Sequence, residues 1–248
     1  MNPSKSGLST MAGTGIVVVL IVLVLGGVYL APSLLKGGSI STSTISSQTC
    51  VSNSNIGSNQ TFGLVSLFGC FSQMQIQDTL LDQGQGMVGA VPQQLTFSYH
   101  VLGQAPFGST QDIKVDFSQL GGNHEVVAWF SPGGIVDRLD IIGDRNYTGP
   151  GAAIFAQTFT SAFSAITTVT NNATLLSSLS KTSQNATSIG PTRLDVTTYH
   201  LAVPAPPYKS ITAKYATIPG TYQRLAVYLD EKMTDGTEKT FQILSLAK

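Results

Sequence analysis

The 248-residue chain has room for a membrane anchor and one domain of about 150–200 residues, which can bury a core without many disulfides or metals. Only 10% of its residues are charged, against about 25% in an ordinary soluble domain, while it contains 27 Ser and 27 Thr. Thirteen acidic and thirteen basic side chains give zero net charge, so we predict that the chain does not bind nucleic acid.

The N-terminal segment is predicted to cross a membrane. Residues 13–35 carry no charge and contain an unbroken aliphatic run at 16–25, and about 20 such residues span the hydrocarbon core as a helix. A lone strand would leave its backbone unpaired in lipid. A cleaved secretory signal is the alternative, but its apolar region is about 7–15 residues long. We expect a short cytoplasmic N-terminus or leader at 1–12 and an uncleaved transmembrane helix at 13–35.

The segment after the anchor predicts the orientation. Between Lys36 and Asp78 there is no charged residue, and eight of the eleven residues at 39–49 are Ser or Thr. Such a composition cannot bury enough apolar surface to fold, so 36–60 is predicted to be a flexible stalk. We expect the stalk and a domain at 61–248 to lie outside the cell.

The two cysteines, Cys50 and Cys70, enclose 19 residues. A disulfide between them would stabilise the fold by about 3 kcal/mol and would indicate an oxidising compartment. The alternative is two separate buried thiols, because Cys70 lies in an apolar run. Glycosylation is predicted at the four Asn-x-Ser/Thr acceptors, although about two such motifs are expected by chance in a chain of this composition. These acceptors are Asn59, Asn146, Asn172 and Asn185.

The N-terminus also resembles a known family. Residues 5–10 (Lys-Ser-Gly-Leu-Ser-Thr), followed directly by a long aliphatic helix, resemble the class III (type IV pilin-like) leaders of archaeal surface proteins. This resemblance implies cleavage after Gly7, although Ser6 here separates the basic residue from the small one. The uncharged stalk is also similar to those of archaeal cell-envelope proteins, particularly from thermoacidophiles. The domain after the stalk matches no defined family.

Period-2 alternation of apolar and polar residues, typical of half-buried β-strands, dominates the chain from Gln94 onward. Turn sequences at 131–134 (Ser-Pro-Gly-Gly) and at Asp235-Gly236 separate neighbouring strands. The predicted strands cover residues 95–101, 113–117, 126–130, 135–142, 193–202, 211–217, 224–231 and 241–245.

Helices are predicted at 151–170, where apolar residues recur at three- and four-residue steps, and over the shorter stretch 173–180. Residues 64–81 could form another helix, although Gly69 weakens that prediction. The order of elements predicts an α+β domain: an antiparallel β-sheet with one or two amphipathic helices packed on one face.

The predicted helix at 151–170 carries Phe155, Phe159, Phe163 and Ile166 on one face. We expect all three Phe rings to be buried against the sheet, with Thr158, Thr160 and Ser161 on the polar side. The other interpretation is that helix and sheet enclose an apolar ligand pocket, which residues of the same kind would line.

Sequence motifs that would indicate nucleotide binding, metal binding or catalysis are weak. Residues 84–89 spell G-x-G-x-x-G but precede Ala-Val-Pro, where no helix can begin to receive a phosphate. His124-Glu125 begins an H-E-x-x-H motif, but position 128 is Ala. His100 and His200 could in principle join His124 around a metal, yet three scattered histidines more often lie at strand ends. Asp137 and Asp140 flank Arg138 in a strand, which is typical of a solvated face.

We therefore predict no enzyme activity, metal or cofactor. Three functions remain: a structural or interaction module of the cell envelope with protein partners there, a binding protein for a lipid or small apolar ligand, and a pilin-like subunit that oligomerises through its anchor helix. An apolar cavity beneath the helix would favour the second, and a bundle of anchors in an assembly would favour the third.

Overall fold

A computed structural model describes residues 50, 62–81, 92–119, 125–201, 204, 206–221 and 223–248. The predicted leader, anchor and stalk lie outside these residues, apart from Cys50. Asn59, the glycine motif at 84–89 and His124 lie outside them as well. All of the described residues belong to one compact unit, Ile40–Lys248.

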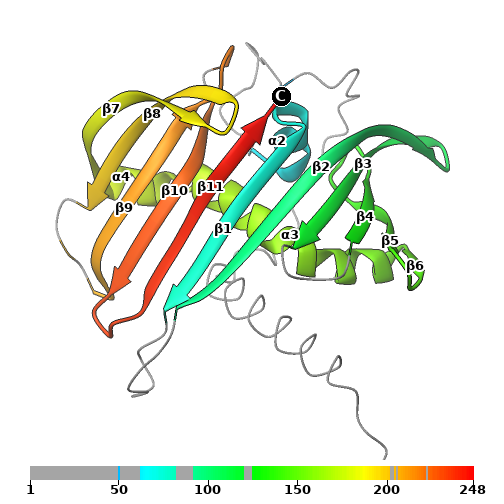
Figure 1. The fold of residues 1–248 in the computed structure, drawn as a ribbon, viewed down its shortest axis with the longest axis horizontal. Coiled ribbons are helices and arrows are strands. Elements are labelled where there is room, and N and C mark those ends of the chain that lie inside the picture. The colour runs from blue at the N-terminus through cyan, green and yellow to red at the C-terminus, as the bar shows by residue number, and fades with distance from the viewer. Residues whose placement is uncertain are drawn as a thin grey trace, which may run out of the picture. The chain divides into compact units, whose positions relative to one another are not determined.

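The described residues form one antiparallel sheet of eleven strands, ordered β6-β5-β4-β3-β2-β1-β11-β10-β9-β8-β7 (Figure 1). Pairing of β1 with β11 joins the first and last strands, so the sheet consists of two meanders that meet at its centre. The strands are β1 Gln73–Leu81, β2 Gln93–Phe107, β3 Thr110–Gln119, β4 Glu125–Phe130, β5 Val136–Ile141, β6 Asn146–Thr148, β7 Leu179–Ile189, β8 Thr192–Leu201, β9 Tyr208–Thr217, β10 Arg224–Met233 and β11 Glu238–Ala247.

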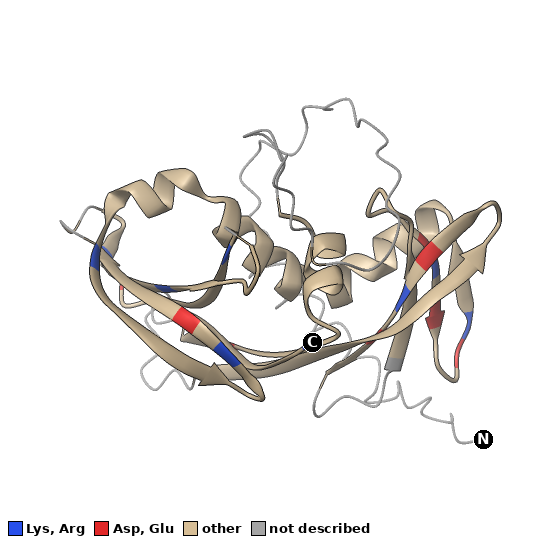
Figure 2. Cartoon of the chain, turned by 90° about the horizontal axis from the view of Figure 1, so that it is seen from above, with Lys and Arg blue, Asp and Glu red and all other residues tan. Residues whose placement is uncertain are grey.

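Helices α2 (Leu64–Cys70), α3 (Pro150–Asn171) and α4 (Ala173–Ser178) lie within the curve of the sheet, on one of its faces (Figure 2). Pro150 lies in the first turn of α3, where its missing N–H costs no hydrogen bond, and Gly149 supplies a φ of 58° just before it. The predicted α+β class, an antiparallel sheet with helices on one face, is confirmed.

Two parts of the predicted element order need correction. The helix predicted for 64–81 ends at Cys70, and β1 comes next, because Met74 and Ile76 alternate with glutamines and enter the core every second residue. The sequence pattern does not predict β7, since the residues between Leu179 and Ile189 are exposed and, apart from Ala186, polar. It does not predict the short β6 either.

Aromatic rings fill the space between α2, α3 and strands β2–β4. Neighbouring ring centroids in this cluster lie 5.0–6.4 Å apart, mostly edge to face. The Tyr99 hydroxyl donates to the Phe71 carbonyl at 3.1 Å, so the one polar group of the cluster is paired. This part of the interface is packed rather than hollow. The aromatic cluster comprises Phe68, Tyr99, Phe117, Phe130 and Phe163.

The buried side of α3 differs from the predicted one. Phe163 and Ile166 are fully buried, as expected, but Phe155 is 43% exposed and Phe159 is only half-buried. Near its start the helix presents Ala152 and Ala156 to the core instead, because alanines let the helix backbone approach the sheet closely.

The surroundings of Phe155 and Thr160 explain the orientation of α3. The Phe155 ring packs on Tyr147 of β6, with centroids 4.3 Å apart. Thr160, expected on the polar side, is buried, and its hydroxyl donates to the Ala156 carbonyl at 3.0 Å. Such a bond within the helix satisfies a buried hydroxyl without any tertiary partner.

Helix α3 is long and apolar enough to cross a bilayer by length and composition alone. Its contacts give another reason for that composition. The Tyr215 hydroxyl donates to the Val169 carbonyl at 3.3 Å, and the Ala226 N–H donates to Thr170 Oγ1 at 2.9 Å. These bonds and the burial of Phe163 identify α3 as the core helix of this domain.

The predicted disulfide between Cys50 and Cys70 is confirmed. Cys70 ends α2 and is buried, so the bond ties Cys50 directly to the core. The alternative of two separate thiols is excluded.

Asp78 makes stability depend on pH. It lies on β1 between Leu95 of β2 and Phe241 of β11, and burial raises its pKa from 3.8 to about 6, against the opposing effects of a Thr79 backbone hydrogen bond and of Lys239. A raised folded pKa means that the folded chain holds the proton more tightly. Stability present below about pH 4 is therefore lost as the pH rises through about 6.

We expect this loss to be at most about 3 kcal/mol, since each pKa unit corresponds to 1.36 kcal/mol. Urea denaturation of the wild type and Asp78→Asn between pH 4 and pH 7 measures it, and the variant should show a flatter profile. Asp235→Asn is the control, because a backbone hydrogen bond from Thr237 lowers the pKa of that exposed carboxyl. A wild-type stability that rises across this range would contradict the prediction.

Candidate functional site

The face of the sheet opposite the helices, here called the outer face, carries the candidate site. Residues paired across antiparallel strands project to the same side, so the register defines this face. At the centre of the sheet, Gln75 of β1 pairs with Ser98 of β2, which pairs with Ser118 of β3. One step along, Gln73 pairs with His100, which pairs with Asp116.

These side chains border a hollow of about 330 Å³, here called the central hollow. Amides and hydroxyls supply most of its lining, with one His, one Asp and Ser245 of β11, and Met74 and Tyr99 border it as well. The hydroxyls of Ser98 and Ser118 are hydrogen-bonded at 2.6 Å, which holds this part of the floor in place. The central hollow therefore offers many neutral hydrogen-bonding groups and little charge.

A serine, a histidine and an aspartate meet here, as in nucleophilic hydrolases. The backbone argues against that chemistry. Strands β1, β2 and β3 each have a neighbour on both sides, so ladder hydrogen bonds occupy their N–H groups. A serine in this position lacks a pair of free donors for a developing oxyanion. The arrangement can bind a polar group.

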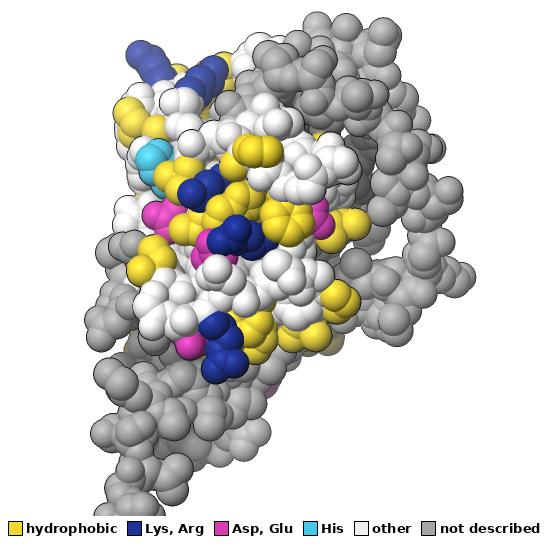
Figure 3. Space-filling model, turned by 90° about the vertical axis from the view of Figure 1, so that its right-hand side faces the viewer, with side chains coloured by type: hydrophobic (Ala, Val, Ile, Leu, Met, Phe, Trp, Pro, Cys, Tyr) yellow, Lys and Arg dark blue, Asp and Glu magenta, His cyan; other side chains and the backbone are white. Residues whose placement is uncertain are grey.

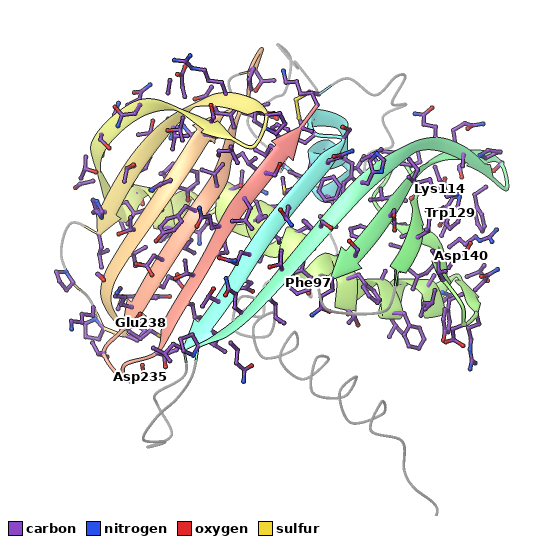
Figure 4. All side chains as sticks on the ribbon, in the orientation of Figure 1. Phe97, Lys114, Trp129, Asp140, Asp235 and Glu238 are labelled. Atoms are coloured by element: carbon purple, nitrogen blue, oxygen red, sulfur yellow. A yellow bond between two sulfur atoms is a disulfide. The ribbon has the colours of Figure 1, made fainter. Side chains whose placement is uncertain are left out.

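Trp129 of β4 lies on the outer face beside the central hollow. Its ring lies between Lys114 Nζ and Arg138 Cζ, at 5.0 and 4.7 Å from the centroid, and only 8% of the residue is exposed. Lys114, Trp129 and Asp140 lie near one another at this end of the sheet (Figure 4). Arg138 also makes two hydrogen bonds of 2.8 Å to Asp140. Arg138 and Asp140 were expected on a solvated face. They instead form a half-buried ion pair, and Arg138 packs on the Trp129 ring.

Asp137, on the other side of Arg138, has a different environment. Its pKa is raised by burial and by the neighbouring carboxyl of Asp112, which is fully buried. Figure 3 views the β5–β6 end of the molecule, where hydrophobic side chains lie among basic and acidic ones. Ile142, Ile154 and Phe155 are exposed.

The two histidines that the structure describes do not meet. His100 lies on β2 and His200 on β8, with four strands between them, a separation of about 24 Å at 4.8 Å per strand. His200 Nδ1 hydrogen-bonds to Thr212 Oγ1 at 2.9 Å. Among the described residues, no group of three or more His, Cys, Asp or Glu side chains could hold a metal.

The three described sequon asparagines are all exposed. Asn172 caps α4, because its Oδ1 accepts a hydrogen bond from the Leu175 N–H at 2.8 Å, which leaves Nδ2 for a sugar. Asn146 lies on the edge strand β6, and Asn185 lies on the edge strand β7. Accessibility is therefore compatible with glycosylation at each of them.

Sequence reasoning did not identify the central hollow. Ser98, His100 and Asp116 occupy the polar positions of predicted strands, such as Ser98 between Phe97 and Tyr99. Gln73 and Gln75 lie on β1, where a helix was predicted. That alternation is the one available signal. It cannot reveal which polar residues meet, because 45 positions separate Gln73 from Ser118 and only the register brings them together.

Comparisons with known proteins give no family. No family model matches the chain, and no curated protein matches it. Among solved structures, MucB in complex with MucA(peri) is similar over 71% of this chain and 49% of that one, with 13% identity and a TM-score of 0.33. The chain thus spans about half of that protein.

A DUF1329 family protein from Desulfovibrio piger is similar over 71% of this chain and 84% of that one, with 8% identity and a TM-score of 0.29. Both TM-scores are below 0.5, so neither similarity supports an inference about function.

Proposed function

We propose that the chain is a membrane-anchored extracellular module of a cell envelope, without catalytic activity, and that it binds a neutral polar partner through the outer face of its sheet. The central hollow is the observation that carries this proposal. Amides of Gln73 and Gln75 and the hydroxyls of Ser98 and Ser118 suit a glycan or a glycan-coated envelope protein, since such surfaces present neutral donors and acceptors.

The placement outside the cell is supported by the aliphatic segment 13–35, by the uncharged stalk and by the disulfide, since disulfides persist mainly in oxidising compartments. The pilin-like leader is part of this proposal, with cleavage after Gly7 as its testable detail. Oligomerisation through the anchor helix remains the alternative for an assembled filament.

Binding of a lipid or apolar ligand has less support. That function needs a cavity beneath α3, and the aromatic cluster fills the interface of α3 with β2–β4. Phe163 there is fully buried.

Protease treatment of intact cells tests the placement. We expect the domain beyond the stalk to be removed while the first 36 or so residues remain with the membrane, because a span of about 20 apolar residues shields what it crosses. Protection of the domain until the cells are lysed would contradict the proposal.

Binding is tested with full-length protein in detergent and immobilised native envelope fractions. Gln75→Ala together with His100→Ala should weaken binding about tenfold or more, since two hydrogen bonds of about 1 kcal/mol each are lost. Gln93→Ala is a matched control, because Gln93 is exposed on β2 but does not line the central hollow. Equal binding by all these proteins would reject the outer face as the binding surface.

A further inference from the structure

A second hollow on the outer face lies beneath the β7–β8 hairpin. This hairpin turns over the sheet in front of β9 and β10, so that its tip reaches β11 (Figure 1). The hollow has a volume of about 260 Å³ and is here called the hairpin hollow. Asn185 and Thr187, the acceptor and the hydroxyl residue of one sequon, both line it. They lie two positions apart on β7 and therefore project to the same side.

The lining of the hairpin hollow combines two kinds of surface. Ile189 and Val196 supply buried aliphatic groups. Polar side chains, among them Thr198, Lys214 and Gln242, supply the second kind of surface. A sugar ring has apolar C–H faces and a polar hydroxyl rim, so it can satisfy both. The Tyr228 ring, with Lys214 Nζ 4.8 Å from its centroid, adds an aromatic surface.

The hairpin tip is fastened to β11. The Thr192 hydroxyl donates to the Leu246 carbonyl at 2.7 Å. Gly190 lies against Ser245, so closely that an added Cβ would come within 3.1 Å of the Ser245 backbone Cα. This close contact holds the hairpin tip against β11 and requires glycine, both for space and for its φ of +60°.

We propose that Asn185 carries an N-linked glycan whose first sugars lie in the hairpin hollow. The occupant is small, because the volume is below the roughly 300–1,000 Å³ of sites for drug-sized ligands. The sugars cover Lys214 and Tyr228, and the rest of the glycan leaves by the open side. This inference rests on the extracellular placement in the proposed function, since N-glycosylation occurs on that side of the membrane.

The first test is mass spectrometry of glycopeptides from the full-length protein isolated from its native membranes. Modification of Asn185 is expected, and an unmodified Asn185 overturns the inference. Modification of Asn146 or Asn172 with a bare Asn185 would overturn it too, while leaving the extracellular placement intact. The two proposals therefore fail separately.

The second test measures acylation of lysines in the native glycosylated protein. Asn185→Gln should raise the labelling rate of Lys214 several-fold, because the covering sugars are lost. Lys181, exposed on β7, is the internal standard and should not change. Asn172→Gln, which removes a different acceptor, should leave Lys214 unchanged. Equal Lys214 labelling in the wild type and Asn185→Gln overturns the inference.

The contact of the hairpin tip with β11 supplies a third comparison. Gly190→Ala should also raise Lys214 labelling, because the hairpin tip can no longer rest on Ser245. Gly220→Ala is matched for backbone strain, with a φ of +81° and no atom within 4 Å of the added Cβ, and should have no effect on Lys214. Unchanged labelling in Gly190→Ala would show that the hairpin does not close the hollow and would overturn this part of the inference.

Discussion

Phe163→Ala should lower the free energy of unfolding by about 3–5 kcal/mol, the usual cost of truncating a well-packed Phe. The Phe163 ring is fully buried, 5.1 Å from the Tyr99 ring and 5.7 Å from the Phe117 ring, so its removal leaves a cavity between helix and sheet. Such a loss is a large part of the total stability of a typical domain. Urea denaturation followed by circular dichroism measures it.

Phe155→Ala is the matched control from the same helix. Because Phe155 is 43% exposed and contacts Tyr147 at the sheet edge, its truncation should cost less than about 1 kcal/mol. A small loss for Phe163→Ala would contradict the packed interface. It would revive the apolar-ligand hypothesis, and a search for a lipid that restores stability would be the next experiment.

Loss of the disulfide should have the next largest effect. Cys50→Ala should lower the free energy of unfolding by about 3 kcal/mol, because opening a loop of this length returns conformational entropy to the unfolded chain. This substitution leaves Cys70 in its buried position, so the effect of the cross-link is separated from that of core packing.

Denaturation with and without reductant provides the control for this experiment. Reductant should destabilise the wild type by about the same amount and leave Cys50→Ala unchanged. A wild type that is indifferent to reductant would show that the cross-link does not contribute to stability, and two free thiols in protein isolated without reductant would contradict the structure.

The sequence alone determined those elements whose signal is local. Strands β2–β5 and β8–β11 alternate apolar and polar residues, and α3 repeats apolar residues at helical spacing after Gly149-Pro150. Each pattern arises because one side of the element is buried, so it predicts the element without information on what packs against that side. The two cysteines likewise indicated their own pairing, because no third thiol competes.

Only the tertiary structure decided the features that depend on neighbours. Helix α3 faces the core with Ala152 and Thr160 rather than Phe155, because the closeness of the sheet there, not hydrophobicity alone, selects small residues. Strand β7 has no alternation, since both of its sides are exposed along most of its length, and its pairing with β8 defines it.

The two hollows show the same limit. The central hollow joins Gln73 to Ser118, and the hairpin hollow joins Asn185 to Gln242. Neutral polar residues at strand positions carry no individual signal of function, because any solvent-facing strand can have them. Strand register and the turn of the β7–β8 hairpin bring these residues together, and both depend on contacts between distant parts of the chain.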